Sequence, residues 1–394
     1  MDIEQGRIGR IHDYDMNFNH LKSRMFELRE KYPSGVIIPI IENDLETPAI
    51  DKIIDGLNDC DYLKKIYIAL ATNTEKGYNK AENAFSKLEG PHEIVWCNSQ
   101  KVTNVLNELG KKGLDVTNLH GKGKDLWIAL GIASLELHAI AIHDADITTY
   151  SGLLPTKLLY SVVEPRLDFW FAKGYYARID LEKRRIYGRI YRLFINPLLE
   201  ALQKKLPNKS TFIRYLQSFR YTLSGEMAIY TDIALNLRIP SDWGLEIGIL
   251  AELYRNASNK RICEVDLGFF DHKHKPISRD SLLITAETSL VTLLRTLTET
   301  EGIDISEAFL LSLQVTYRRF AQDRIRQYHA DAICNNLDYD RHEEETSVEA
   351  LSDVISVAGK LYMKNPMSAQ LPDWLRTISA MSDAREQLRD AAIQ

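Results

Sequence analysis

Residues 137–147 read LHAIAIHDADI, and this apolar run ending in acidic residues decides the fold. Apolar runs of this length are typical of strands that are buried in a parallel sheet. Three similar runs lie upstream, at 36–41 (VIIPII), 65–71 (KIYIALA) and 92–97 (HEIVWC). Because helix-forming stretches separate these runs, the chain predicts repeated βαβ units around a parallel sheet.

The segments between these strands are predicted to be helices. Thr47-Pro48 opens AIDKIIDGL, because a capping residue followed by proline marks the first turn of a helix. Further helices are expected at 80–89 (KAENAFSKLE), 101–110 (KVTNVLNELG) and 125–136 (DLWIALGIASLE).

The pattern loosens between residues 153 and 225. This part contains the aromatic-rich segment DFWFAKGYYARI and a predicted basic helix at 181–193, LEKRRIYGRIYRL. A helix-forming region at 226–256 and a strand at 261–270 (RICEVDLGFF) follow, and after residue 280 the chain is predicted to be helical to its end.

These elements predict three parts. We expect a helical arm at 1–33, an α/β domain at 34–278 and a mainly helical C-terminal module at 279–394. Apolar faces in the arm and at 309–325 exceed what the α/β core needs, and surplus apolar surface is typical of subunit contacts. We therefore expect a homodimer that uses the helical module.

Composition excludes several classes of partner. The 49 basic and 55 acidic residues give a net charge of −6, which does not attract nucleic acid or an anionic membrane. No apolar stretch approaches the roughly 20 residues that span a bilayer, and the polar N-terminus does not resemble a signal peptide. The four cysteines lie far apart without CxxC spacing, which favours reduced thiols in the cytoplasm.

Asp144 and Asp146 directly follow the strand at 137–142. Ligands of open α/β sheets bind beyond the carboxyl ends of the strands. Two carboxylates in such a turn are suited to a divalent cation that bridges diphosphate oxygens. A bare DxD also recurs by chance in solvated turns, but its position after a buried strand favours a functional site.

The same stretch, DADIT, matches the DxDxT nucleophile motif of haloacid-dehalogenase-type phosphatases. In those enzymes the motif follows the first strand of the domain, and an acidic pair lies downstream. Here it follows about the fourth predicted strand, and no convincing acidic pair follows. A phosphatase is therefore the weaker alternative from another enzyme class.

Gly121-Lys122-Gly123-Lys124 precedes the helix that begins DLWIAL. Glycines let a backbone approach phosphate closely, and a helix N-terminus offers free N–H groups. The motif is not a P-loop, because the upstream glycine and the Ser/Thr after lysine are missing. A basic loop without function is the competing interpretation.

Three further segments contain candidate residues. LSGE (223–226) is predicted to form a tight turn before a helix, and PSDWGLEIG (240–248) places acids and an aromatic ring at a helix start. His272 and His274, just past a strand, suit a metal ligand beside an anion. By default Asp242 would be a helix cap and Trp243 a core residue. The basic run around Arg189 would by default be a solvated helix face.

In order and spacing, GKGKDLW, HDADI, GRIYRLFINPLLEAL, LSGE, DWGLEIGIL and DHKHKPI resemble the GT-A glucosyl-3-phosphoglycerate synthases. The resemblance runs from about Val36 to Ser278, and it extends to mannosylglycerate synthase. It implies a retaining glycosyltransferase with a Rossmann-like, nucleotide-sugar-binding GT-A domain. It also implies Mg²⁺ or Mn²⁺, UDP- or GDP-glucose as donor, and 3-phosphoglycerate as acceptor.

The resemblance also implies roles for individual residues. Residues of the nucleotide and diphosphate site would be Pro39, Ile40, Glu42, Lys122, Asp144 and Ala145. The metal would be held by Asp146 and His272. Residues around the acceptor and sugar would be Arg189, Tyr191, Leu223, Ser224, Gly225, Asp242, Trp243, Glu246 and His274. Among these, Glu246, the Leu223 backbone and Asp144 would lie at the reacting centre.

Two positions depart from the family pattern. Tyr191 stands where a small hydroxyl residue is usual, and His274 stands where asparagine is typical. Both departures concern the acceptor. A mannosyl- or glucosyltransferase that acts on unphosphorylated glycerate therefore stays open as the nearest alternative.

Overall fold

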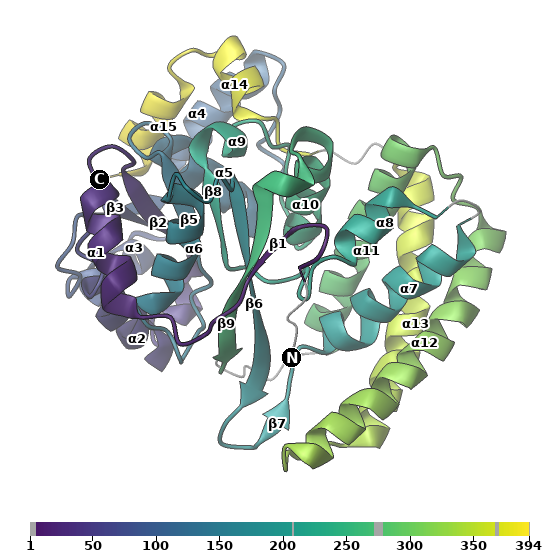
Figure 1. Cartoon of the computed structure of the whole chain (residues 1–394). Helices are drawn as coiled ribbons and strands as arrows, with labels where there is room; N and C mark the ends of the chain where they lie inside the picture. Colours follow the sequence, from purple (N-terminus) through teal and green to yellow (C-terminus); the bar gives the residue numbers. More distant parts are fainter. Residues whose placement is uncertain (1–4, 207–208, 272–278, 367–369, 394) are drawn as a thin grey trace.

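The computed structural model describes residues 5–206, 209–271, 279–366 and 370–393. An α/β part lies beside a helical part, and the chain passes between them more than once (Figure 1). The helices of the α/β part and its surroundings span Phe18–Leu28 (α1), Pro48–Asn58 (α2), Glu75–Phe85 (α3), Gln100–Lys111 (α4), Lys122–Ala133 (α5), Leu153–Val163 (α6), Thr231–Ala234 (α9) and Leu245–Asn256 (α10).

Within the described residues the sheet has nine strands, in the order β1-β9-β6-β8-β5-β2-β3-β4, and β7 pairs with β6 off this path. The strands span Gly9–Ile11 (β1), Ser34–Ile41 (β2), Lys65–Ala71 (β3), His92–Trp96 (β4), Ala139–Ile142 (β5), Phe171–Asp180 (β6), Arg185–Ile186 (β7), Met227–Tyr230 (β8) and Ile262–Phe270 (β9).

The predicted parallel strands are confirmed, but the sheet as a whole is mixed. β2 lies between β5 and β3 in parallel register, and β4 continues this half beyond β3. β8 is antiparallel to both β5 and β6, so it joins this half to the parallel strands β6, β9 and β1. The prediction of a helix-forming region at 226–256 was wrong for its first residues, because pairing on both sides makes a strand of the short segment MAIY.

The predicted basic helix at 181–193 was also wrong in its first half. The aromatic segment before it is β6, and the chain turns back at Asp180 to form β7. The Asp180 carboxylate accepts a hydrogen bond from the Lys183 N–H at 2.8 Å, and Arg184 takes a left-handed conformation with φ of 50°. Helical structure begins only at Ile190–Ile195 (η2), a π-helical turn that leads into α7.

The helical part includes most of the chain after residue 280, which was predicted to be helical. It contains Asn196–Lys205 (α7), Thr211–Leu216 (α8), Arg279–Glu301 (α11), Glu307–Cys334 (α12) and Arg341–Lys364 (α13). α13 packs against both α11 and α12, and α7 packs against α12. A buried hydrogen bond of 2.8 Å from the Tyr317 hydroxyl to the Leu193 carbonyl ties α12 to η2.

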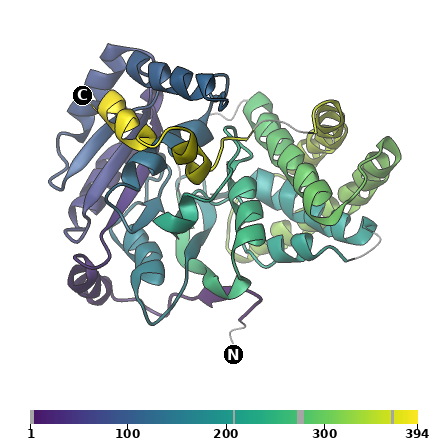
Figure 2. The same cartoon turned by 90° about the horizontal axis from the view of Figure 1, so that it is seen from above.

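Both ends of the chain add to the α/β part. β1, within the predicted arm, extends the sheet at β9. Trp374–Ala380 (α14) and Ala384–Ala392 (α15) return from the helical part and lie over the α/β part (Figure 2). The Trp374 ring stacks on Trp127 of α5 with centroids 4.3 Å apart, and each indole N–H donates to a backbone carbonyl. Among the described helices, none has the length and apolar character needed to cross a membrane.

Candidate active site

The carboxyl end of β5 places the first candidate residues. His143 continues the strand, and its N–H donates to the Ile37 carbonyl at 3.1 Å. Its ring is fully buried and meets Tyr150 edge-on at 5.3 Å. Burial lowers the pKa of His143 to about 3, so the imidazole is neutral and anchors the strand end. Asp144, the next residue, is only half-buried and begins the acidic turn.

Lys122 joins two carboxylates that are distant in sequence. Its Nζ lies 2.7 Å from Asp144 Oδ1 and 3.1 Å from Glu246 Oε1, and all three side chains are at least two-thirds buried. Burial alone would lower the pKa of Lys122, but the two carboxylates outweigh it and raise the pKa above its ordinary value. Residues predicted from three separate motifs therefore form one charged cluster.

Close packing of two loops brings Glu246 to this cluster. The Gly123 N–H donates to the Ser241 carbonyl at 2.9 Å. A Cβ at Gly123 would lie 2.0 Å from the Pro240 carbonyl oxygen, and one at Gly121 would lie 2.7 Å from that of Ser241. Gly121 also has φ of 116°, a conformation that favours glycine. These glycines are thus required by the neighbouring loop at the start of α10.

The turn at 223–226 lies against Asp144, but it precedes the strand β8 and not the helix that was predicted. Met227 pairs with Ile142 at the end of β5, which brings the turn beside the acidic residues. A Cβ at Gly225 would lie 2.4 Å from Asp144 Oδ2, so a larger residue there would displace the Asp144 carboxylate. The fully buried Glu226 accepts a hydrogen bond from the Asp144 N–H at 3.4 Å.

Charge in this cluster is unevenly matched. Among the described residues, the carboxyl groups that act on one another here are those of Asp44, Asp144, Asp146, Glu226 and Glu246, and the bases are Lys122, Lys173 and Arg178. Burial, followed by the charge of Asp144, raises the pKa values of Asp146 and Glu226. A divalent cation would relieve this crowding of carboxylates, so the donor set fits the predicted metal.

The full ligand set of a metal is not contained in the described residues, where no group of three or more His, Cys, Asp or Glu is placed to hold an ion. His272, the predicted partner of Asp146, and His274 both lie outside the described residues. The metal role of Asp146 and His272 therefore stays a prediction.

The other residues predicted for the nucleotide lie at the carboxyl ends of β2 and β5. Glu42 accepts a hydrogen bond from the Thr72 hydroxyl at 2.9 Å and lies 3.7 Å from Lys80. Pro39 is half-buried in β2, whereas Ile40 and Ala145 are buried in the apolar core. Among Pro39, Ile40, Glu42 and Ala145, Glu42 carries the polar side chain, and it directly follows the carboxyl end of β2.

Arg189 lies where the α/β part meets the helical part. Its Nε donates to Glu344 at 3.1 Å, and its guanidinium also pairs with Glu343. The Arg192 guanidinium donates to Glu344 Oε2 at 2.9 Å, and the Arg185 guanidinium donates to Glu343 Oε2 at 2.5 Å. Arg185, Arg189 and Arg192 are therefore paired with the first turn of α13 and do not form a solvated helix face, whereas Lys183 and Arg184 are exposed.

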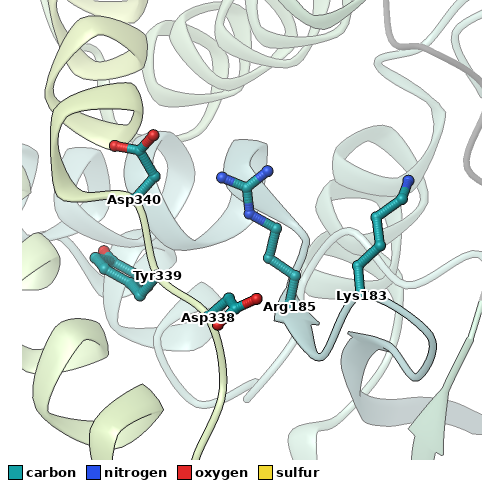
Figure 3. Close-up of a pocket in the computed structure, with 5 residues that line it drawn as sticks. All are labelled: Lys183, Arg185, Asp338, Tyr339 and Asp340. Atoms are coloured by element: carbon teal, nitrogen blue, oxygen red, sulfur yellow. The ribbon is translucent and has the colours of Figure 1, made fainter.

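An open groove of about 540 Å³ lies at the same junction (Figure 3). It is lined by Lys183, Arg185, Asp338, Tyr339 and Asp340, and none of these belongs to the charged cluster around Lys122. Tyr191 belongs to η2, and its ring centroid lies 5.0 Å from that of Tyr221. Because Tyr221 leads into the turn at 223–226, Tyr191 connects the arginines to that turn.

Comparisons with known proteins agree with this geometry, although no protein-family model matches the chain. The chain is 46% identical to glucosyl-3-phosphoglycerate synthase of Methanococcoides burtonii over 396 residues, which cover 100% of this chain and 98% of that protein. It is 37% identical to the protein of the same name from Persephonella marina over 360 residues, 90% of this chain and 88% of that protein. The chain belongs to the glucosyl-3-phosphoglycerate synthase family.

Solved structures support the fold of this family member. Glucosyl-3-phosphoglycerate synthase of Mycobacterium tuberculosis, crystallised with Mn²⁺, UDP and phosphoglyceric acid, has a TM-score of 0.53 at 18% identity and covers 73% of this chain and 86% of its own. Mannosyl-3-phosphoglycerate synthase of Rubrobacter xylanophilus has a TM-score of 0.54 at 20% identity, with 72% and 80% covered. The predicted GT-A type of α/β fold is confirmed.

Two residues of the family motif DWGLEIGIL differ from their default interpretations. Asp242 Oδ1 accepts a hydrogen bond from the Gly244 N–H at 2.8 Å and stabilises the turn before α10, but the N-cap residue of that helix is Gly244, so Asp242 is not the helix cap. Trp243 is 51% exposed and is therefore not a core residue. An exposed indole beside Glu246 is compatible with the sugar or acceptor contact predicted for it.

Sequence reasoning missed three charged residues of this synthase site: Lys173, Arg178 and Glu226. Lys173 and Arg178 lie on β6, a segment rich in aromatic residues that was not predicted to be a strand. Glu226 belongs to the LSGE motif but received no role. A usable signal existed for the first two, because charged residues within a buried strand are rare unless they are paired.

Proposed function

We propose that this chain is a metal-dependent, retaining glucosyltransferase that transfers glucose from an NDP-glucose to 3-phosphoglycerate. The observation that carries the proposal is the junction of Lys122, Asp144 and Glu246, which three separate motifs predict and one cluster contains. Relatives named for this reaction that match 100% and 90% of the chain support it. The M. tuberculosis protein has been crystallised with Mn²⁺, UDP-glucose and phosphoglyceric acid, which supports the same substrates here.

The leaving nucleotide diphosphate is the centre of this mechanism. Lys122 would donate to its oxygens, because charge develops there as the glycosidic bond breaks. Asp146 and His272 would hold Mg²⁺ or Mn²⁺, with Asp144 nearby, and the ion would neutralise part of the same charge. Glu42 would contact the nucleoside from the edge of the sheet. Before substrate binds, the Lys122 ammonium is held in place by the two carboxylates.

Glu246 and the turn at 223–226 would act on the sugar and the acceptor. Glu246 is 7% exposed and fixed by Lys122, so it orients a hydroxyl and does not move freely. The acceptor hydroxyl would attack an oxocarbenium-like sugar from the face that the diphosphate leaves. The Leu223 backbone and Glu246 would flank this centre, and retention of configuration follows from attack on that face.

Arg189 would bind the carboxylate or phosphate of the acceptor. A guanidinium can grip such a group with two parallel hydrogen bonds. Its present partners, Glu343 and Glu344, are carboxylates, so the guanidinium already donates to groups of this kind, which supports the proposal. Trp243, Tyr191 and His274 would complete the acceptor surface.

A panel of substrates tests the proposal. The protein is incubated with UDP-glucose, GDP-glucose or GDP-mannose, each with 3-phosphoglycerate or glycerate, with and without Mg²⁺, and the product is identified by mass. We expect glucosyl-3-phosphoglycerate only in the presence of the metal. A mannosyl or unphosphorylated product would replace this assignment, and phosphate release without nucleotide-sugar would refute it.

The protein is further proposed to work in the cytoplasm as a homodimer. Leu311 and Val315 on α12 are 61% and 72% exposed, and Val357 and Leu361 on α13 are 52% and 45% exposed. Spacing of four residues places each pair on one helix face. Contact between two such faces would cover these side chains. A monomer by light scattering at micromolar concentration would refute this assembly.

A further inference from the structure

Lys173 is a fully buried lysine near the middle of the sheet. It lies on β6 opposite Met227 of β8, with 0% of its surface exposed. Its Nζ donates to the Ser224 carbonyl at 2.7 Å, inside the turn that touches Asp144. Transfer of an ammonium group from water into the interior is costly unless it is bound by polar partners. If Lys173 only filled space, a methionine at this position would give a more stable protein.

The turn at 224–226 is held from β6 at two points. Lys173 binds the Ser224 carbonyl, and the Gly174 N–H donates to the Glu226 carbonyl at 2.9 Å. Within the turn, the Ser224 hydroxyl donates to Glu226 Oε2 at 3.1 Å and accepts from the Glu226 N–H at 3.2 Å. This arrangement fixes both the backbone and the carboxyl group of Glu226.

Asp144 depends on the same turn. Its N–H donates to Glu226 Oε1, and its carboxylate lies so close to Gly225 that a side chain there would displace it. A shift of the Ser224 carbonyl would therefore move Gly225 and Glu226, and with them the Asp144 carboxylate that binds Lys122. The Leu223 backbone, next to Ser224, would move as well.

We propose that Lys173 is a positioning residue, whose ammonium group holds the Leu223–Glu226 turn so that Asp144 and the Leu223 backbone face the reacting sugar. This inference rests on the proposed glucosyl transfer, because it assigns the turn to the reacting centre. Lys173 touches neither substrate in this account and acts through Ser224.

Charge also favours a positioning role for Lys173. Burial lowers the pKa of Lys173 to about 8, and the nearby Glu246 and Glu226 oppose this shift. The ammonium thus feels two buried carboxyl groups, that of Glu246 and that of Glu226 within the turn. A charged donor makes a stronger hydrogen bond to a carbonyl than a neutral one, which suits a turn that must not move during the reaction.

Lys173→Met tests the inference, because methionine keeps an unbranched apolar side chain as far as Cε and removes the ammonium group. Misplacement by about 1 Å at a reacting centre costs roughly 100-fold, so kcat should fall by about that factor. The KM values for UDP-glucose and 3-phosphoglycerate should stay within about threefold. A folded Lys173→Met variant with wild-type kcat would overturn the inference.

Lys157→Met is the matched control. Lys157 is also a buried lysine that binds a backbone carbonyl, that of Asp266 at 2.9 Å, and its charge pairs with Asp13 outside the acidic cluster. This variant should lose stability and keep the kcat of its folded fraction. An equal loss of kcat in both variants would show that any buried lysine has this effect, and it would overturn the specific role of Lys173.

Ser224→Ala keeps the inference testable if Lys173→Met does not fold. It removes the hydroxyl that ties Ser224 to Glu226 and leaves the carbonyl that Lys173 binds. We expect a drop in kcat with little change in either KM, and an unchanged kcat would contradict the account of an anchored turn. Failure of the proposed function is distinguishable, because the wild-type protein would then form no product.

Discussion

Replacement of Arg189 by alanine tests the acceptor site. In the structure the Arg189 side chain is 24% exposed and pairs with Glu343 and Glu344. Removal of the guanidinium should not unfold the junction, because Glu344 keeps its two hydrogen bonds from Arg192 and one from Tyr339. The effect should therefore be confined to binding of the acceptor.

The size of the effect follows from exposure. A charge-assisted pair that is shielded from water is worth about 2–5 kcal/mol, and partial exposure of Arg189 places it near the lower end. A loss of about 2 kcal/mol corresponds to an increase of roughly 30-fold in the acceptor KM. The KM for the nucleotide-sugar should stay nearly unchanged. Arg189→Lys should restore activity only in part, because lysine keeps the charge and loses the fork.

Glu343 provides the opposite perturbation. It is 40% exposed and occupies Arg185 and Arg189, so an acceptor anion must compete with it. Half-exposed ion pairs contribute about 0.2–1 kcal/mol, and Glu343→Gln should lower the acceptor KM by a factor of about 1.4 to 5. Glu345→Gln, which removes the exposed pair of Glu345 with Arg341, is the matched control and should change nothing.

Initial rates at saturating UDP-glucose, with 3-phosphoglycerate and glycerate as competing acceptors, measure these effects. If Arg189 grips the phosphate, Arg189→Ala should also lose its preference for 3-phosphoglycerate. Unchanged acceptor kinetics in Arg189→Ala would mean that the arginine only joins the two parts of the protein. The choice of a phosphorylated acceptor would then lose its support from this residue.

Three further predictions concern the metal, the turn and pH. Asp146→Ala should cut turnover by about two orders of magnitude or more without unfolding, and EDTA should do the same reversibly to the wild type; full activity in EDTA contradicts the metal role. Gly225→Ala should lower kcat at least about tenfold, because its methyl group displaces the adjacent carboxylate; wild-type kinetics would refute this. Hydrogen bonds from Arg166 and Arg24 lower the pKa of the buried Glu164 to about 2, so their stabilisation is present above about pH 4.5 and is lost as pH falls toward 2. The difference in unfolding free energy between wild type and Glu164→Gln, about 2 kcal/mol at neutral pH after allowance for exposed Arg166, should vanish near pH 2, and a difference independent of pH would refute the assignment.

Sequence reasoning located the parallel strands well because their signal is local. KIYIALA at 65–71 is β3 with the predicted bounds, since a continuous apolar run between helices has few other solutions. β6 was missed for the opposite reason. Its aromatic and charged residues show no clear alternation, and its strand character comes from pairing with β8 and β9, which lie far away in the chain.

The candidate site shows the same division. The position of Asp144 at the end of β5 was predictable from the strand that precedes it. Its bond to Lys122 was expected only because a family resemblance placed both at one diphosphate. The bond from Lys173 to Ser224 joins residues 51 positions apart without any motif that marks it. The pairing of Arg189 with α13 spans more than 150 positions and depends on how the helical part docks.

The central claim is transfer of glucose with retention to the acceptor hydroxyl of 3-phosphoglycerate. Nuclear magnetic resonance of the product formed from UDP-α-glucose, 3-phosphoglycerate and Mg²⁺ tests it most directly. The account predicts a single phosphorylated glucosylglycerate with an α-linkage and one equivalent of UDP. A β-linked product, or release of inorganic phosphate from 3-phosphoglycerate without consumption of UDP-glucose, would contradict it.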